Sequence, residues 1–486
     1  MRAMLAPLGR CSLSSSLGSL RQATLSQIED RFAAALPDSL LPQYPNKTHS
    51  RLRIFSVYRT FWCWLWQLLQ GPASCREVVR QLQSLFLLHD APQKIEVGTS
   101  AYCQARSGLP SALLETVFNA SFRSAERGAP EPATPLLQNR PVRVVDGSGI
   151  RLADTPKNRV AYPPSVNLPA GTSFPILRLV VLFCLKSGAL LAQASDSLCK
   201  GELRLFTSLF ACLRPGDIVL GDRAYGIYVM AALLKNIGVD LIATVPARSR
   251  RVDFRRTKKR LGPHDALFEW KKPRKISPLV EPNNWKALPE LLSVRLLRLS
   301  LVRHGFRTQH LVVITTLLDS KLYPKDEILA THARRWRMEM CLDDIKTTLG
   351  MESLRCQCPQ MVQKELLVFL TAHNLVRWLM GQAAGHGRVS PECLSFKGTL
   401  DAFRQWSQAI AQSRRKKDRI KLWEELLLTL VRDRLPDRPG RHEPRAVKKR
   451  SQYPHLNTPR RLFKDRPTRA QRRRRATARK RAASLI

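Results

Sequence analysis

The sequence predicts an α/β fold, because three different residue patterns follow one another along the chain. Residues 1 to 126 show helical spacing of apolar residues, interrupted by prolines. From Pro141 onward, apolar runs of strand length alternate with helical segments. Residues 247–320 are basic and again contain strand-like segments. We therefore expect a helical N-terminal domain, an α/β core and a β-rich insertion that interrupts this core.

The N-terminal domain is expected to span residues 1–126. The segment Thr99–Leu114 looks like two short helices joined at Gly108–Pro110. This geometry occurs in DNA-binding helix-turn-helix units and in many purely structural helical pairs, so both interpretations stay open. Residues 127–140 are rich in proline and are expected to form a linker. The other helical segments are residues 25–35, 52–70, 74–88 and 111–124.

Residues 141–246 are expected to form the first part of the core. Val142–Val145 is a short apolar strand that leads into Asp146 and a glycine turn. Ile176–Leu185 is almost continuously apolar, as expected of a central strand buried on both faces. A returning strand and then alternating helices and strands follow, at Ala189–Ala194, Glu202–Leu213, Asp217–Gly221, Ile227–Asn236 and Asp240–Val245. This order is the one expected of the ribonuclease-H-like α/β fold.

The second half of the chain departs from this alternation. Roughly seventy residues, 247–320, are more than a tight strand-to-helix connection needs, so we interpret them as the β-rich insertion. The core resumes in residues 321–382, which contain an acidic amphipathic helix at Arg334–Glu352. Residues 383–450 are expected to be helical, and residues 451–486 to be a basic, disordered tail.

The charge of the chain indicates a polyanionic partner. The sequence has 81 Lys and Arg against 38 Asp and Glu, a formal net charge of +43. Such a positive field favours nucleic acid, although ribosome-like RNA binding or an acidic membrane surface would also explain it.

Neither the cysteines nor the apolar segments suggest a secreted or membrane protein. The 11 cysteines are scattered and show no zinc-site or disulfide spacing. Residues 1–20 do not resemble a signal peptide, because Pro, Gly and a Ser run break them. Ile54–Leu69 is short and contains Arg59 and Gln67, so we expect a buried helix there and a cytoplasmic protein without a membrane span.

Three carboxylates are candidates for a metal site. Asp146 and Asp222 each follow an apolar strand beside a glycine, which gives the backbone room to turn and DNA room to approach. Glu339 lies on the acidic helix. Hard oxygen ligands suit Mg²⁺ or Mn²⁺, and two such ions activate a water or a 3′-hydroxyl in phosphodiester chemistry.

The acidic helix has a charged face beside its apolar stripe. Met338, Leu342, Ile345 and Leu349 form the stripe at helical spacing. On the same helical wheel Glu339 is flanked by three potentially cationic groups, namely His332, Arg335 and Lys346. A solvated face with ion pairs four residues apart is the alternative interpretation.

Other acids compete for the same roles. An Asp after a strand is often only a turn or helix cap. Asp217 begins its strand and so belongs to the opposite edge of the sheet, whereas Asp343 is the most credible substitute for Glu339. The remaining competitors are Asp154, Asp196, Glu202 and Asp344.

Two motifs together carry a family resemblance. One is Arg335-x3-Glu339-x6-Lys346, and the other is the turn Gly221–Gly226, which reads Gly-Asp-Arg-Ala-Tyr-Gly. With these motifs the chain resembles the DDE transposases of bacterial insertion sequences, in the insertion-sequence-4 type branch. The resemblance spans about residues 30 to 450. The signature of that branch is Tyr-x2-Arg-x3-Glu-x6-Lys, and His332 stands here at the position of its Tyr.

The resemblance implies a function and a set of site residues. Asp146, Asp222 and Glu339 would be the catalytic triad that binds two Mg²⁺ or Mn²⁺ ions per active site. DNA contacts are expected from five residues, namely Arg335, Lys346, His332, Arg223 and Tyr225. Trp270 and Trp285 are candidates to stabilise a flipped base, with burial as the alternative.

Members of this family cleave double-stranded DNA at inverted-repeat ends and join the 3′-hydroxyl to target DNA in a synaptic complex. The resemblance therefore implies a homodimer, cut-and-paste DNA transposition and a cytoplasmic, nucleoid-associated location in a bacterium. The alternatives are a metal-dependent nuclease of the same fold and a catalytically decayed transposase that only binds DNA.

Overall fold

The computed structural model describes most of the chain between residues 54 and 436. The described ranges are 54–71, 73–88, 95–132, 136–163, 174–245, 257–301, 309–413 and 415–436, with residues 32, 35, 36 and 254. The predicted tail at 451–486 and most of the predicted helix at 25–35 lie outside these residues.

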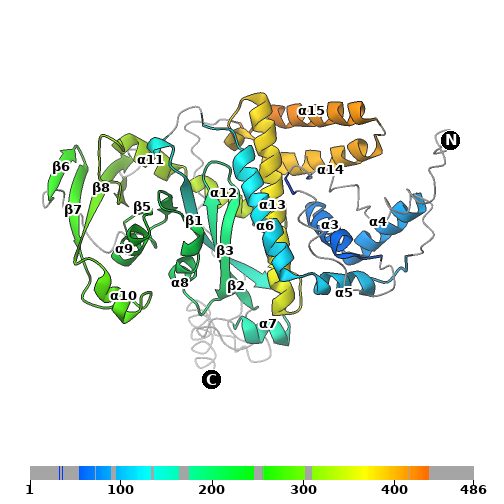
Figure 1. Ribbon diagram of the computed structural model, residues 1–486, viewed down its shortest axis with the longest axis horizontal. Helices are drawn as coiled ribbons and strands as arrows, with labels where there is room; N and C mark the ends of the chain where they lie inside the picture. The colour runs from blue at the N-terminus through cyan, green and yellow to red at the C-terminus, as the bar shows by residue number, and fades with distance from the viewer. Residues whose placement is uncertain are drawn as a thin grey trace, which may run out of the picture.

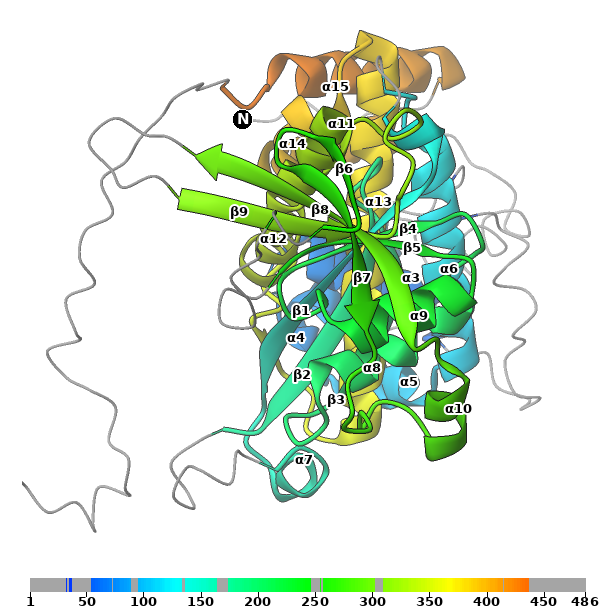
Figure 2. The same cartoon turned by 90° about the vertical axis from the view of Figure 1, so that its left-hand side faces the viewer.

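A single mixed sheet is the centre of the molecule (Figures 1 and 2). Along its main path the strands are ordered β3-β2-β1-β4-β5-β9-β8-β7-β6, and β10 pairs with β1. The strands of the first half are β1 (Val142–Leu152), β2 (Ile176–Cys184), β3 (Leu190–Ser197), β4 (Ile218–Gly221) and β5 (Asp240–Thr244). Strands β1 to β3 are antiparallel neighbours, whereas β1, β4 and β5 run parallel. The predicted α/β class and the predicted strand order of the core are therefore present.

The strands of the predicted insertion continue the core sheet. They are β6 (Lys259–Gly262), β7 (Asp265–Lys271), β8 (Leu291–Leu301) and β9 (Gln309–Thr315), with the short helix α10 (Pro282–Ala287) between β7 and β8. Strand β9 pairs antiparallel with β5, where Ile314 lies opposite Ala243. The segment is thus β-rich, but it extends the sheet at the edge that β5 would otherwise leave unpaired.

Helices cover both faces of the sheet. The helix α13 (Pro359–Gly387) lies along α6 (Ser111–Gly128) over one face, with α14 (Phe396–Gln412) and α15 (Lys416–Arg432) beside it (Figure 1). Helices α8 (Glu202–Thr207) and α9 (Tyr228–Asn236) cover the other face. Further helices are α3 (Val57–Leu69), α4 (Cys75–Leu88), α5 (Ser100–Gly108) and α7 (Pro156–Ala161). None of the helices in the described ranges is long and apolar enough to cross a lipid bilayer.

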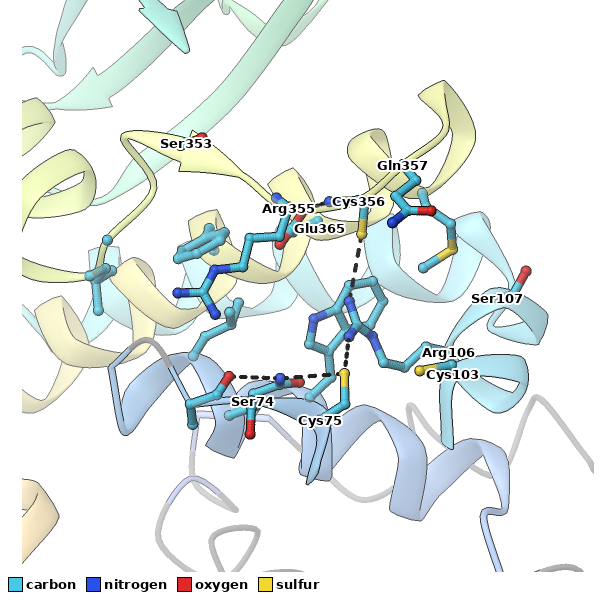
Figure 3. Close-up of a pocket in the computed structure, with 18 of the residues that line it drawn as sticks. Ser74, Cys75, Cys103, Arg106, Ser107, Ser353, Arg355, Cys356, Gln357 and Glu365 are labelled. Atoms are coloured by element: carbon cyan, nitrogen blue, oxygen red, sulfur yellow. Dashed lines mark hydrogen bonds between the residues drawn. The ribbon is translucent and has the colours of Figure 1, made fainter. Parts of the chain in front are cut away.

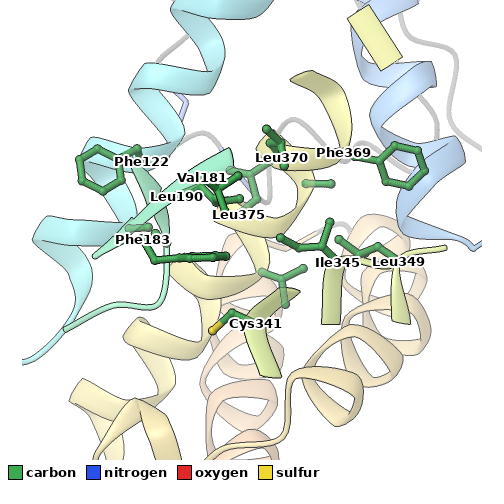
Figure 4. Close-up of a cluster of buried hydrophobic side chains, with 14 of the residues drawn as sticks. Phe122, Val181, Phe183, Leu190, Cys341, Ile345, Leu349, Phe369, Leu370 and Leu375 are labelled. Carbon is green, nitrogen blue, oxygen red and sulfur yellow. The ribbon is translucent and has the colours of Figure 1, made fainter. Parts of the chain in front are cut away.

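Alternation along β1 divides the core into two layers. Val144 faces the large cluster formed with α6 and α13, whereas Val145 faces the cluster formed with α8 and α9. Figure 4 shows part of the first cluster, in which Phe183 of β2 and Leu375 of α13 lie near Ile345. The segment that contains Ile345 is thereby anchored to the sheet through α13.

A buried ion pair stabilises the strands of the extended edge. Arg295 on β8 is fully buried, and its Nε and Nη2 donate to the two carboxylate oxygens of Asp265 on β7 at 2.8 and 2.6 Å. Its Nη1 donates to the carbonyl oxygen of Tyr323 at 2.7 Å. The carboxylate of Asp265 is the counter-ion of this guanidinium, and a buried guanidinium without a counter-ion is costly.

We predict that Asp265→Asn destabilises the fold strongly. The substitution leaves the buried Arg295 without its charge partner, so the free energy of unfolding should fall by about 3–5 kcal/mol. The control is Glu269→Gln on the same strand, because Glu269 pairs with Lys258 at the surface and should contribute less than about 1 kcal/mol. Urea unfolding of both variants measures the difference, and equal effects would contradict the assigned role of Arg295.

Candidate active site

The pairing of β1 with β4 brings Asp146 and Asp222 together. Val142 and Val144 of β1 lie opposite Ile218 and Leu220 of β4 in parallel register. Continued by two residues, this register sets Asp146 level with Asp222, the first residue after β4. The two aspartates that the sequence singled out are therefore neighbours at the same edge of the parallel strands.

The glycine turn predicted after Asp146 is not present. Strand β1 continues through Asp146 to Leu152, and Gly147 and Gly149 pair with Val180 and Arg178 of β2. Strand β2 pairs with β1 from Arg143 to Arg151, which keeps the Asp-Gly-Ser-Gly segment extended. Asp146 thus lies within a strand, whereas Asp222 follows the end of its strand as predicted.

The glycines beside the two aspartates make room for protein side chains. A Cβ atom on Gly147 would lie 2.5 Å from the carboxyl carbon of Glu202, and one on Gly221 would lie 2.8 Å from the Cβ of Tyr225. The hydroxyl of Tyr225 donates to Oε1 of Glu202 at 2.7 Å. Both glycines therefore make room for one hydrogen-bonded pair, the buried Tyr225 and the half-buried Glu202, beside the two aspartates.

Burial shifts the ionisation of Asp146. Loss of solvent raises the pKa of this carboxyl to about 6, and the negative charges of Glu339 and Glu202 act in the same direction. The backbone N–H of Gly147, which donates to Oδ1 at 2.8 Å, and the charge of Arg335 act against this rise in pKa. The charges of Glu202, Glu339 and Arg335 therefore lie close enough to Asp146 to affect its pKa.

The predicted acidic helix is divided into segments of different pitch. The helix α11 (Lys325–Ala333) is followed by a turn, then by α12 (Trp336–Asp343) and a π-helical segment, η5 (Asp344–Thr348). At the turn, hydrogen bonds span three residues, as from the N–H of Met338 to the carbonyl of Arg335. The predicted apolar stripe is nevertheless buried, including Met338 at 3% and Ile345 at 0% exposure.

Because of this change of pitch, the residues that were predicted to form one charged face do not all lie together. Arg335 Nη2 lies 2.8 Å from Glu339 Oε1, as an i,i+4 pair. Lys346 is half-buried in η5. His332 lies instead on α11, where it is 8% exposed and its Nε2 is 2.9 Å from Thr244 Oγ1. Burial and the nearby Arg335 lower the pKa of His332 to about 4, so its ring is neutral at pH 7.

Two predicted DNA contacts are therefore interior residues in this structure. His332 and Tyr225 both pack inside the protein, whereas Arg223 is exposed in the turn after Asp222. The sequence motifs identified all three residues as candidates. Only the tertiary contacts of His332 with Thr244 and of Tyr225 with Glu202 reveal which side chains are buried.

The competing acids have other partners, with the exception of Glu202. Asp217 is buried beside Arg143, and Asp344 pairs with Arg377. These ion pairs give both aspartates a structural role. Asp343 is exposed and accepts a hydrogen bond from Thr347. The surface pairs are Asp154 with Arg159 and Asp196 with Lys200.

Glu202 is the first residue of α8, the helix that follows β3. This position, at the start of the first helix after three consecutive strands, was the sequence signal that could have identified Glu202 as a site residue.

The carboxylates do not form a complete metal cage. Their oxygen atoms suit Mg²⁺ or Mn²⁺ chemically. Within the described ranges, however, no three His, Cys, Asp or Glu side chains are grouped closely enough to hold one ion. One of the three predicted ligands, Glu339, is engaged with Arg335.

The two tryptophans considered for a flipped base pack against other side chains. Trp285 is 6% exposed, with Lys272 over its ring and Tyr228 beside it. Trp270 is half-buried and also contacts Tyr228 edge-on. These contacts agree with the alternative interpretation, in which both tryptophans pack inside the protein.

Three comparisons with known proteins each found a transposase. Residues 137–375 match a family model described as a transposase DDE domain. The chain is 27% identical over 409 residues to the transposase InsG for insertion sequence element IS4 of Escherichia coli (strain K12), covering 83% of this chain and 88% of that protein. A cryo-EM structure of the piggyBac transposase synaptic complex with hairpin DNA aligns with 88% of this chain and 87% of that one, at 9% identity and a TM-score of 0.39.

We predict that Asp146→Asn stabilises the protein at alkaline pH. The folded-state pKa of about 6 exceeds the ordinary value of 3.8, so the folded chain binds more protons between these pH values and loses stability as the pH rises through them. An amide does not ionise and therefore has no such penalty. The free energy of unfolding of the variant should exceed that of the parent protein by on the order of 2 kcal/mol at pH 8, and the two should be equal at pH 4.

Urea unfolding at both pH values tests this prediction. The control is Asp154→Asn, because hydrogen bonding to Arg159 lowers the pKa of Asp154, so its loss should give no gain at pH 8. A variant at Asp146 that is less stable than the parent protein at pH 8 would contradict the burial of an ionised carboxylate there.

Proposed function

Because the chain belongs to the DDE transposases of the insertion-sequence-4 type, we propose that it cleaves the inverted-repeat ends of an insertion sequence and joins them to target DNA. The observation that supports this most directly is the register of β1 and β4, which sets Asp146 beside Asp222. Both acids lie within the residues that match the transposase DDE domain. We further propose that the core is ribonuclease-H-like.

Glu339 completes the proposed catalytic set. Its charge raises the pKa of Asp146, which supports a position near that aspartate, although Glu339 is paired with Arg335. Glu339 must be released from Arg335 before its carboxylate can act together with those of Asp146 and Asp222. Two Mg²⁺ or Mn²⁺ ions per site are the proposed cofactor, which would supply the electrophilic assistance that phosphodiester chemistry needs.

Cations around these acids are proposed to bind DNA phosphates. Arg223 is exposed directly after Asp222, Arg335 is the N-cap residue of α12, and Lys346 lies in η5. Guanidinium and ammonium groups bind phosphate oxygens through charge-assisted hydrogen bonds. Tyr225 and His332 would act indirectly, by holding Glu202 and Thr244 in place.

The other parts of the chain have proposed roles in assembly. We assign residues 1–126 to DNA binding and assembly, 141–246 and 321–382 to the core, 247–320 to the insertion and 383–450 to the helical C-terminal region. Two copies would hold two DNA ends together in the cytoplasm of a bacterium, and the charge of +43 agrees with double-stranded DNA as the partner.

We predict that Asp146→Asn and Asp222→Asn each abolish chemistry but preserve DNA binding. Loss of an essential carboxylate should reduce cleavage and joining by about a thousandfold or more. A plasmid strand-transfer assay with a pre-cleaved inverted-repeat end and Mg²⁺ or Mn²⁺ measures joining, and electrophoretic mobility shift measures binding. The control Asp154→Asn removes an exposed acid that pairs with Arg159 and should leave both activities intact.

This assay also separates the alternative functions. Cleavage without joining would make the protein a nuclease and overturn the proposed transposition. DNA binding by the parent protein without cleavage in either metal would indicate a DNA-binding protein that has lost its catalytic activity.

A further inference from the structure

Two arginines at the turn between α11 and α12 share one carboxylate. Arg334 is the C-cap residue of α11, and Arg337 lies in the first turn of α12. Nη2 of Arg334 lies 2.5 Å from Oε1 of Glu392, and Nη1 of Arg337 contacts Oε2 of the same side chain. Each oxygen of Glu392 thus binds one guanidinium group, and the carboxylate bridges the turn.

Glu392 belongs to a well-anchored part of the C-terminal helical region. It lies in the short helix η6 (Pro391–Cys393), which contacts α13. Pro391 is buried, and the carbonyl oxygen of Cys393 accepts the backbone N–H of Leu435 at 2.7 Å. The two ion pairs of Glu392 therefore connect the turn to a segment that is itself held by the helices.

The same turn carries the residue that binds Glu339. Arg335 stands between the two clamped arginines, and because each residue advances about 100° around a helix, its side chain leaves on a different side. Nη2 of Arg335 pairs with Oε1 of Glu339 at 2.8 Å. The contacts of Glu392 on one side of the turn thus help to set the direction of Arg335 and Glu339 on the other.

Glu392 also neutralises two cations that repel each other. Burial lowers the pKa of Arg334 and of Arg337, and the positive charge of Arg334 lowers the pKa of Arg337 further. In the described part of the chain no other carboxylate pairs with either arginine. Without Glu392 the turn would hold two partly buried guanidinium groups close together and without a counter-ion, which is unfavourable.

The other end of the acidic segment has empty space beside it. Leu349 and Gly350, directly after η5, line a cavity of about 570 Å³ between the N-terminal helices and residues 353–358 (Figure 3). Residues that border a void have fewer packing contacts to hold them. The position of the acidic segment therefore depends more strongly on the contacts at the turn, where Glu392 binds.

We infer that Glu392 is a positioning residue of the active site. It acts through Arg334 and Arg337, which fix the turn, and the turn in its turn sets the place of Arg335 and Glu339. The fixation of the turn stands on the ion pairs alone, whereas its effect on DNA joining rests on the proposed function.

Hydrogen–deuterium exchange of the full chain tests the fixation of the turn. In Glu392→Gln the two guanidinium groups lose their counter-ion, so the backbone N–H groups of residues 334–343 should exchange about tenfold faster than in the parent protein. The centre of α13, residues 362–376, should exchange as before and serves as the internal reference.

A matched control is available on α14. Asp401 also binds two cations, Lys397 and Arg404, at 2.8 and 3.0 Å, but neither of them belongs to α11 or α12. Asp401→Asn should therefore leave the exchange of residues 334–343 as in the parent protein.

Combined variants show whether Glu392 acts through the two arginines. In the double variant Arg334→Gln/Arg337→Gln the carboxylate has no cation to bind, so adding Glu392→Gln should change the exchange of residues 334–343 by less than about twofold. Glu392→Asp keeps the charge and should retain part of the protection. Circular dichroism checks that every variant is folded.

The strand-transfer assay measures the consequence for the reaction. At saturating DNA, Glu392→Gln should join about tenfold more slowly than the parent protein, because a displaced catalytic group lowers the rate of the chemical step. Its dissociation constant for DNA, from electrophoretic mobility shift, should change by less than about twofold, since most cations of the chain are untouched. Asp401→Asn should keep both values.

The exchange and the joining measurements can fail independently. Faster exchange together with slower joining supports the inference. Unchanged exchange in Glu392→Gln, or a full effect of this change in the Arg334→Gln/Arg337→Gln background, overturns it, and so does faster exchange with undiminished joining. If the parent protein binds DNA without joining it, the proposed function fails, and exchange alone then decides whether Glu392 fixes the turn.

Discussion

The parallel pairing of β1 with β4 is the constraint on which the rest of the site depends. It sets Asp146 level with Asp222, and the antiparallel pairing with β2 keeps β1 extended past that point. Because the strand does not turn after Asp146, the surface beside Gly147 stays open to a side chain from α8, and Glu202 occupies it with Tyr225 as its hydrogen-bond donor. The geometry of four polar residues thus follows from one strand register.

The same arrangement concentrates negative charge at the cost of stability. Burial, Glu339 and Glu202 all favour the protonated form of Asp146, and only the N–H of Gly147 and the charge of Arg335 oppose them. Arg335 is paired with the carboxylate of Glu339 and thereby places a positive charge beside these acids. A carboxyl pKa that is raised by burial and by neighbouring carboxylates is typical of functional sites.

Helix α13 connects this site with the helical part of the protein. It packs against α6 and α3 on one side and contributes Phe369 and Leu375 to the cluster that anchors Ile345 (Figure 4). The N-terminal helices and the segment that contains Ile345 consequently pack against the same helix.

The sequence by itself determined the strand order, the two aspartates and the motif Arg335-x3-Glu339-x6-Lys346, because apolar runs and short spacings are local properties of a chain. It also identified the stripe from Met338 to Leu349 that the structure buries. Only the tertiary structure decided that β1 continues, that α11 and α12 are separate helices, and that His332 and Tyr225 are interior. These features depend on partners distant in sequence, such as β2, Thr244 and Glu202, whose pairing no local pattern encodes.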